Sequence, residues 1–173
     1  LLFSSNLSWL NIIRVRSFDA ATFVAYGGAD LGVVGYDVLK EFDYPEIYAP
    51  IDLRIGKCHL SIAKLENQIN EDNTFIKIAT KYPKITKNHF RSIGINVNCI
   101  KMNGAMEIAP KLGLSDKIVD LVSSGKTLKA NGLIEEEKIL DITSHLIVNR
   151  SAFKTRTKKI RHIMSLFQGA LND

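Results

Sequence analysis

The chain has few of the cysteines and histidines that form disulfide cross-links or metal sites in small proteins. It contains only two cysteines, Cys58 and Cys99, and their wide separation fits neither a disulfide framework nor a metal motif. The four histidines, at positions 59, 89, 145 and 162, are scattered without the short spacings of a metal site. We therefore expect reduced thiols in a cytoplasmic protein, and structural or surface roles for the histidines.

The sequence also lacks any apolar run long enough to cross a bilayer, and no charged-then-apolar leader stands at its start. No Ser-His-Asp or Cys-His arrangement is recognisable. The 173 residues, 46% hydrophobic and 24% charged, suit a globular protein of one large domain or two small lobes. Because the chain starts without Met and enters a strand pattern almost at once, we expect an N-terminal segment to be missing.

Positive charge is concentrated in one segment near the C-terminus. The net charge is +5, and residues 150–161 hold basic side chains without an acid: Arg150, Lys154, Arg156, Lys158, Lys159 and Arg161. Nucleic-acid binders more often interleave such residues with aromatics, whereas here only Phe153 interrupts the run. We expect a solvated helix face or a subunit contact, and no nucleic-acid partner.

The first half of the chain predicts alternating strands and helices. Strands are expected at 11–16, 30–35 and 54–64. A helix capped by Ser17 should end at Gly27, and a shorter one should start at Asp37. The polar stretch 65–73 has no apolar periodicity, which marks it as the boundary between two lobes.

The second half repeats strand and helix more regularly. Strands are predicted at 75–80, 95–102 and 117–123. A helix should run from Pro83 to Gly94, and a short helix interrupted by Pro110 should follow the second strand. Such alternation predicts a parallel sheet with right-handed crossovers, in which ligands bind beyond the carboxyl ends of the strands. The phrases "TKYP", "KMNGAME" and "SSGKT" should therefore face one cleft.

The predicted organisation is an α/β chain of two lobes, whose last segment returns to the first lobe. Residues 1–66 form lobe I, 73–134 form lobe II, and 135–173 return to lobe I. The last segment contains two extended pieces and an amphipathic helix. Its apolar face recurs at helical spacing: Ile160, Ile163, Met164, Phe167 and Leu171.

The turn after the 117–123 strand is rich in hydroxyl groups. Ser123, Ser124, Gly125, Lys126 and Thr127 resemble the end of a P-loop, but that motif needs glycine where Asp120 stands. Backbone N–H and hydroxyl groups in such a turn can bind a phosphate monoester, and an acid just upstream can accept from a vicinal diol. The pattern predicts a ribose 5-phosphate site. An ordinary turn with a capping aspartate is the alternative.

Other residues are predicted to border the same cleft. Glu107, near a helix start, could orient a hydroxyl or a bound Mg²⁺. Lys81 and Tyr82 suit the phosphates and base of a nucleotide, and Arg16 and Asp19 flank a strand end. The alternatives are an exposed helix-start glutamate, a snorkelling lysine beside a half-buried tyrosine, and tight packing at the strand end.

These phrases together resemble ATP phosphoribosyltransferase, the family that opens histidine biosynthesis. The resemblance rests on "DAATFVAYGGADLGVVGYDVL", "ATKYP", "NGAMEIAPKLGLSDKIVDLVSSGKTLKANGL" and "LIVN" in the family's order and spacing. It covers essentially the whole chain, and residues 103–133 are its most specific part. It implies condensation of ATP with phosphoribosyl pyrophosphate, with Mg²⁺, to give N1-(5-phosphoribosyl)-ATP and pyrophosphate.

The resemblance also assigns residues. Residues 123–127 would hold the 5-phosphate and Asp120 the ribose hydroxyls, with Asp120 and Glu107 as the catalytic pair. The family often has Thr where this chain has Ser124, which keeps the hydroxyl. The ATP side of the cleft would be lined from both lobes, by Arg16, Asp19, Lys81 and Tyr82.

The implied fold has two α/β lobes resembling type II periplasmic binding proteins, with the active site between them. The family's first strand and its basic glycine-containing loop are expected upstream of residue 1. The chain resembles the short form, which implies a separate regulatory subunit similar to histidyl-tRNA synthetase in a hetero-octamer. The alternative is a non-catalytic ligand-binding or effector domain of the same architecture.

Overall fold

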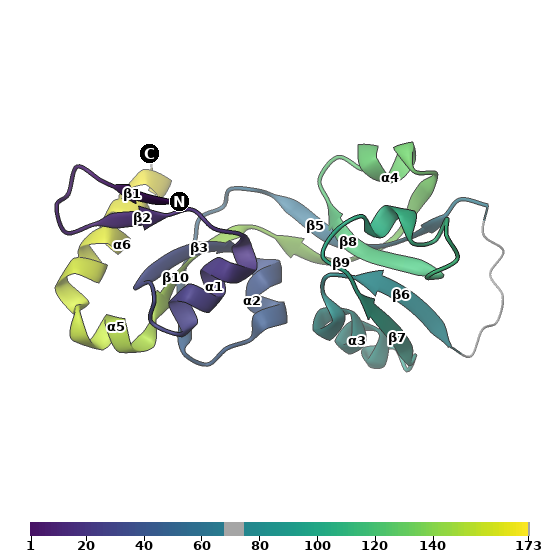
Figure 1. Cartoon of the computed structure of the whole chain (residues 1–173), viewed down its shortest axis with the longest axis horizontal. Helices are drawn as coiled ribbons and strands as arrows, with labels where there is room; N and C mark the ends of the chain where they lie inside the picture. Colours follow the sequence, from purple (N-terminus) through teal and green to yellow (C-terminus); the bar gives the residue numbers. More distant parts are fainter. Residues whose placement is uncertain (68–74, 173) are drawn as a thin grey trace. The chain divides into compact units, whose positions relative to one another are not determined.

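The computed structural model describes residues 1–67 and 75–172. The chain divides into two compact units, which Figure 1 shows with their elements labelled. Unit 1 comprises Leu1–Ile55 and Ser144–Asp173, and unit 2 comprises Gly56–Thr143. Within the described residues, no helix has the length and apolar character needed to span a membrane.

Unit 1 is built on a three-stranded antiparallel sheet. Strand β10 (Ser144–Asn149) lies in the middle, between β3 (Leu31–Gly35) and β4 (Ile47–Asp52). Helices α1 (Ser17–Ala25) and α2 (Tyr36–Phe42) pack on this sheet (Figure 1). Their shared core is made of small and branched side chains: Ala21, Val24, Val34, Val38 and Ile147. Strands β1 (Leu2–Ser4) and β2 (Asn11–Ile13) form a separate antiparallel hairpin.

The C-terminal segment of unit 1 forms two helices, α5 (Arg150–Thr155) and α6 (Thr157–Asn172). Asn149 caps α5 by accepting the Ala152 N–H at 2.9 Å, and its Nδ2 donates to the Val24 carbonyl at 2.8 Å. In α6, Ile160 and Ile163 are buried, and Met164, Phe167 and Leu171 pack against the buried residues Ile51, Leu53 and Leu146. The predicted amphipathic helix is therefore confirmed.

Unit 2 contains a five-stranded mixed sheet with the order β7-β6-β8-β5-β9. The strands are β5 (Cys58–Leu65), β6 (Ile76–Thr80), β7 (Val97–Lys101), β8 (Lys117–Val122) and β9 (Leu133–Ile142). Strand β6 runs parallel to both β7 and β8, whereas β5 runs antiparallel to β8 and β9. The parallel half of the sheet is the part that the sequence predicted.

The described part of unit 2 contains three short helices: α3 (Pro83–Ser92), the 3-10 helix η1 (Met106–Ile108) and α4 (Lys126–Ala130). Met106 of η1 and Leu128 of α4 share a core with Ile118 and Val122 of β8. Since alternate residues of a strand face the same side, Asp120 points to the side that carries η1 and α4.

The unit boundaries differ from the predicted lobes. Residues 56–66 and 135–143 belong to unit 2, because β5 is hydrogen-bonded along one edge to β8 and along the other to β9. The predicted break at 65–73 falls mostly on residues 68–74, which lie outside the described residues. The predicted strand 54–64 begins only at Cys58, the short helix near Pro110 is a single 3-10 turn, and β4 was not predicted.

Candidate functional site

The carboxyl ends of the three parallel strands of unit 2 lie at one edge of the sheet. Strand β6 ends at Thr80, β7 at Lys101 and β8 at Val122, and all three run in the same direction. The segments that follow them contain "KYP", "MNGAME" and "SSGKT". The charges of Glu107 and Lys81 both act on Asp120, so each of these two predicted residues lies within electrostatic range of the acid.

Asp120 is the half-buried acid of this edge. Its Oδ1 accepts the N–H of Leu121 at 2.8 Å. Burial raises the pKa of Asp120 above its usual value, and the charge of Glu107 adds to this, while the Leu121 hydrogen bond and the charge of Lys81 oppose it. The remaining lone pairs of the carboxylate are available to a ligand with hydroxyl donors.

The turn after β8 presents its polar groups to solvent. Ser123, Ser124, Lys126 and Thr127 are exposed, and their side chains have no hydrogen-bond or ion-pair partner among the residues that the structure describes. Gly125 precedes α4 with φ of +68°, a left-handed conformation that glycine adopts without strain. The turn can therefore offer hydroxyls, an ammonium group and backbone amides to an anion.

The segment after β6 is fixed by two buried threonines. The Thr80 hydroxyl donates to the Val119 carbonyl at 2.8 Å and accepts the Tyr82 N–H at 2.9 Å. The Thr86 hydroxyl donates to the Tyr82 carbonyl at 2.7 Å. Tyr82 itself is only 2% exposed, so its ring belongs to the core, whereas Lys81 beside it is half-buried. A ring this deeply buried does not offer its face to a nucleotide base, which was the role predicted for Tyr82.

Arg16 and Asp19 belong to unit 1, unlike the other predicted residues. Arg16 is the N-cap residue of α1, and Asp19 lies in its first turn, where a carboxylate is favoured by the helix dipole. Both side chains are exposed. The structure thus places both residues at the start of one helix of unit 1.

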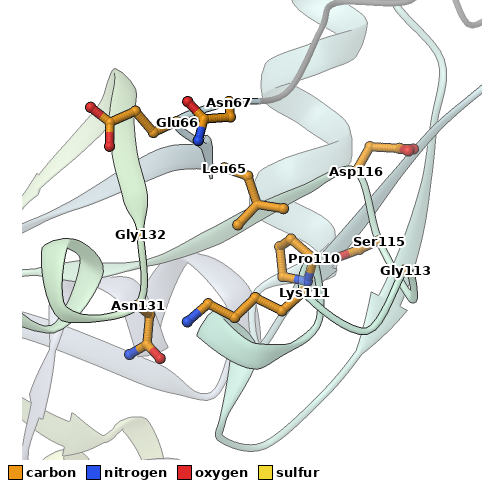
Figure 2. A pocket seen from close by; sticks show the side chains of 10 residues that line it. All are labelled: Leu65, Glu66, Asn67, Pro110, Lys111, Gly113, Ser115, Asp116, Asn131 and Gly132. Carbon is orange, nitrogen blue, oxygen red and sulfur yellow. The ribbon is translucent and has the colours of Figure 1, made fainter.

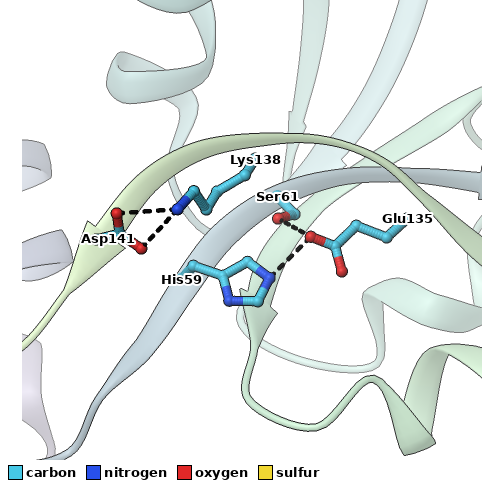
Figure 3. A network of polar contacts seen from close by, with 5 residues as sticks. All are labelled: His59, Ser61, Glu135, Lys138 and Asp141. Carbon is cyan, nitrogen blue, oxygen red and sulfur yellow. Dashed lines mark hydrogen bonds and ion pairs between the residues drawn. The ribbon is translucent and has the colours of Figure 1, made fainter.

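A polar network that the sequence did not reveal lies on β5 and β9 (Figure 3). The Ser61 hydroxyl donates to Glu135 Oε1 at 2.7 Å, and His59 Nε2 lies 2.7 Å from the same oxygen. In the β5–β8 ladder, Ser61 stands opposite Asp120. The sequence offers one weak signal: His59 and Ser61 are polar at alternate positions of a largely apolar strand.

A pocket of about 510 Å³ opens at the other edge of unit 2 (Figure 2). Asp116 precedes β8, Gly132 precedes β9 and Glu66 follows β5, so the pocket is remote from the turn after β8. Its remaining lining residues are Leu65, Asn67, Pro110, Lys111, Gly113, Ser115 and Asn131. None of the predicted site residues lines it. We therefore base the site on the strand ends and not on this cavity.

Comparison with known proteins decides the family. The HisG family model, described as ATP phosphoribosyltransferase, matches residues 16–169.

The chain belongs to the ATP phosphoribosyltransferase family.

Relatives from two organisms carry the family name. The ATP phosphoribosyltransferase of Rhodospirillum rubrum is 56% identical over 174 residues, covering 98% of this chain and 77% of the relative. That of Paramagnetospirillum magneticum is also 56% identical over 174 residues, covering 98% of this chain and 80% of the relative. The family predicted from the sequence motifs is confirmed.

Solved structures agree with this assignment. The ATP phosphoribosyltransferase HisG:HisZ complex from Thermotoga maritima contains a chain that matches with a TM-score of 0.86 at 29% identity, covering 99% of this chain and 88% of that one. A periplasmic sulfonate-binding protein from Methylobacillus flagellatus matches with a TM-score of 0.57 at 14% identity, covering 86% of this chain and 50% of that one. The second likeness concerns the fold alone, and it confirms the predicted α/β class.

Membership of the ATP phosphoribosyltransferase family favours an enzyme over the non-catalytic ligand-binding domain that was the alternative. The family name describes transfer of a phosphoribosyl group, and the acid and open turn at the strand ends have the chemistry to hold such a group. No cluster of three or more His, Cys, Asp or Glu residues within the described part of the chain forms a complete metal site.

Proposed function

We propose that this chain transfers the phosphoribosyl group of phosphoribosyl pyrophosphate to N1 of the ATP adenine, the first step of histidine biosynthesis. The bond from N1 to the anomeric carbon forms while the bond from that carbon to pyrophosphate breaks, and its electron pair leaves with pyrophosphate. One observation carries the proposal: in a member of this family, a half-buried acid and an open hydroxyl turn follow one another at the carboxyl edge of a sheet.

The two ends of the sugar phosphate are assigned to neighbouring groups. The 5-phosphate would bind in the turn of Ser123, Ser124, Gly125, Lys126 and Thr127, whose hydroxyls and ammonium group are exposed. The ribose hydroxyls would donate to Asp120. Because an ionised carboxylate only accepts hydrogen bonds, it discriminates in favour of a diol and against an anion.

The leaving pyrophosphate needs positive charge beside it. Lys81 supplies a cation close enough to Asp120 to act on its charge. Mg²⁺ is commonly held by one or two carboxylates together with substrate phosphates, and Glu107 fits the role of such a carboxylate. When bound, Mg²⁺ would neutralise charge that develops on the pyrophosphate. Burial raises the pKa of Asp120 and the negative charge of Glu107 adds to this, so a cation bound beside the two carboxylates would favour the ionised form of Asp120.

Catalysis in this proposal is alignment and charge stabilisation. The nucleophile is a nitrogen of the substrate, so no protein nucleophile is required. The chain would hold the sugar in place while the cations stabilise the leaving group. Arg16 and Asp19 of unit 1 are proposed to contact ATP, and Tyr82, being buried, would support Lys81 rather than stack on the base.

A regulatory partner is part of the proposal. The Thermotoga maritima relative is a HisG:HisZ complex. We propose that this chain likewise assembles with a separate regulatory subunit similar to histidyl-tRNA synthetase, in a cytoplasmic hetero-octamer. Light scattering on the two proteins mixed and separate would measure the assembly, and a mixture with only the separate masses would contradict it.

Pyrophosphate release from ATP and phosphoribosyl pyrophosphate, measured with the regulatory subunit present, tests the reaction directly. Thr127→Val removes one hydroxyl of the proposed phosphate turn and keeps the side-chain shape. Loss of one hydrogen bond to a charged group should raise the KM for phosphoribosyl pyrophosphate on the order of 10- to 100-fold, with little change in the KM for ATP. The matched control is Thr155→Val, an exposed threonine of α5. Equal effects on both substrates would contradict the phosphate assignment.

A further inference from the structure

Two hydrogen-bond donors of β5 converge on a single carboxylate oxygen of β9 (Figure 3). Ser61 and His59 both meet Glu135 Oε1, each at 2.7 Å. The Ser61 hydrogen bond lowers the pKa of Glu135 and the His59 contact adds to this, against the opposing effect of burial. Because ionised Glu135 can only accept, both the Ser61 hydroxyl proton and a His59 Nε2 proton point to it.

Ser61 has an acidic residue near it on each of its two neighbouring strands, Glu135 on β9 and Asp120 on β8. Ser61 stands opposite Asp120 in the antiparallel β5–β8 ladder. Residues opposite one another in such a ladder point to the same face, with their Cβ atoms about 4.5–5.5 Å apart. A rotation of the serine side chain would therefore bring its hydroxyl to Asp120. A hydroxyl has only one proton to donate, and in this structure Glu135 receives it.

We propose that Glu135 is a positioning residue for the sugar substrate: by accepting the Ser61 proton, it keeps the Asp120 carboxylate open to the ribose hydroxyls. The proposal rests on the function proposed above, in which Asp120 binds the ribose. Glu135 itself need not touch the substrate. Glu135 acts on Asp120 indirectly, because it determines which of the two carboxylates accepts the hydroxyl proton of Ser61.

Removal of Glu135 should change the hydrogen-bond acceptor of the Ser61 hydroxyl. Ser61 is only 1% exposed, and a buried hydroxyl takes a protein partner when water cannot reach it. Without Glu135, the carboxylate opposite Ser61 is that of Asp120. The sugar would then compete with Ser61 for the same lone pairs. The expected cost is a dissociation constant for phosphoribosyl pyrophosphate on the order of 10- to 100-fold higher.

The test is a double-variant cycle on the full chain, with calorimetric titration of phosphoribosyl pyrophosphate in the presence of Mg²⁺. Glu135→Ala should weaken binding, and Ser61→Ala in the same chain should restore it because the competing donor is gone. Glu135→Gln keeps an oxygen that can accept from Ser61, so it should bind far more tightly than Glu135→Ala. A role in stability alone would instead make the two alanine substitutions add to one another.

Glu137→Ala is the matched control. Glu137 lies on the same strand and also has a histidine neighbour: His89 Nε2 is 3.3 Å from its Oε1, without hydrogen-bond geometry. It stands opposite Ile62, whereas Glu135 stands opposite Ala63, so the two acids face opposite sides of the sheet. Binding of the sugar should not change in this variant.

The outcomes separate two kinds of failure. If the wild-type chain does not bind phosphoribosyl pyrophosphate, the proposed function fails and this inference fails with it. If the wild type binds but Glu135→Ala binds equally well, or stays weak after Ser61→Ala, only the inference about Glu135 is wrong. Glu135 is 36% exposed on the outermost strand, so truncation should be tolerated; Glu135→Leu replaces the alanine variant if thermal unfolding shows that it does not fold.

Discussion

Thr80 fixes the segment that carries Lys81 to the strand that carries Asp120, and its removal should have a large effect. Its hydroxyl donates to the Val119 carbonyl and accepts the Tyr82 N–H, and the residue is 0% exposed. Thr80→Val keeps the shape but removes both hydrogen bonds. The bond to Val119 is worth about 0.5–1.5 kcal/mol, and the Tyr82 N–H left unpaired costs about 1–3 kcal/mol. We expect unit 2 to lose about 2–4 kcal/mol of stability.

Native-state hydrogen exchange is the suitable assay because the chain has two units, so a single unfolding midpoint is not well defined. The core amides of β6 and β8 should exchange on the order of 30- to 700-fold faster in Thr80→Val than in the wild type. Amides of β10 in unit 1 serve as the internal control and should not change.

Thr80→Ser is the matched variant. It keeps the hydroxyl and removes one methyl group, which costs about 1 kcal/mol. If Thr80→Val were no less stable than Thr80→Ser, the two hydrogen bonds would contribute nothing and the reasoning about this segment would be wrong.

Two further predictions concern stability. The raised pKa of Asp120 means that folding favours its neutral form. The stability that the neutral acid contributes is fully present below the ordinary pKa of 3.8 and is lost as the pH rises through the pKa of the folded state. Asp120→Asn should therefore unfold at a higher temperature than the wild type at pH 7, and this difference should disappear below about pH 4. The variant should also fail to bind the sugar. Equal unfolding temperatures of the two proteins at pH 7 would contradict the effect of burial on Asp120. Gly32→Ala should destabilise unit 1 by about 1–3 kcal/mol, since its Cβ would lie 2.9 Å from Val24 Cγ2 and 3.3 Å from Ile147 Cγ1. Gly104→Ala, whose Cβ would meet nothing within 4 Å, should change stability by less than about 0.5 kcal/mol, and similar losses in urea unfolding of both variants would refute the packing argument.

The elements that the sequence predicted are those whose signals are local. The strands β6, β7 and β8 are short apolar runs, and Pro83 and Gly94 mark the limits of the helix between the first two. Strand β4 was missed because Pro50 interrupts its pattern, and proline is tolerated mainly at sheet edges, which is where β4 lies. The assignment of β5 and β9 to unit 2 depends on long-range pairing that no local signal encodes.

The same division holds for the candidate site. Asp120 and the hydroxyl turn could be predicted because they are neighbours in the sequence. The link from Ser61 to Glu135 could not, because 74 positions separate the two residues. A bulge in the β5–β9 ladder also changes which face each residue of β9 occupies, so alternation alone would misplace Glu135 relative to Glu137.

The arrangement of β8 explains why a rigid acid and an open turn occur together. Strand β8 is paired on both sides, parallel to β6 and antiparallel to β5. The ladder to β6 reaches Val119, and Asp120, the next residue, pairs with Ser61 of β5, so the backbone that carries the acid is held firmly. The burial of Asp120 disfavours its charged form in the free protein, whereas the side chains of the turn that follows have no partner within the described part of the chain. In the proposed function, a ligand that donates hydroxyls to the acid would offset the cost of burying its charge, and its phosphate would bind the polar groups of the turn. The proposed site would thus combine an acid whose burial disfavours its charge with a turn open to an anion, as expected where function limits stability.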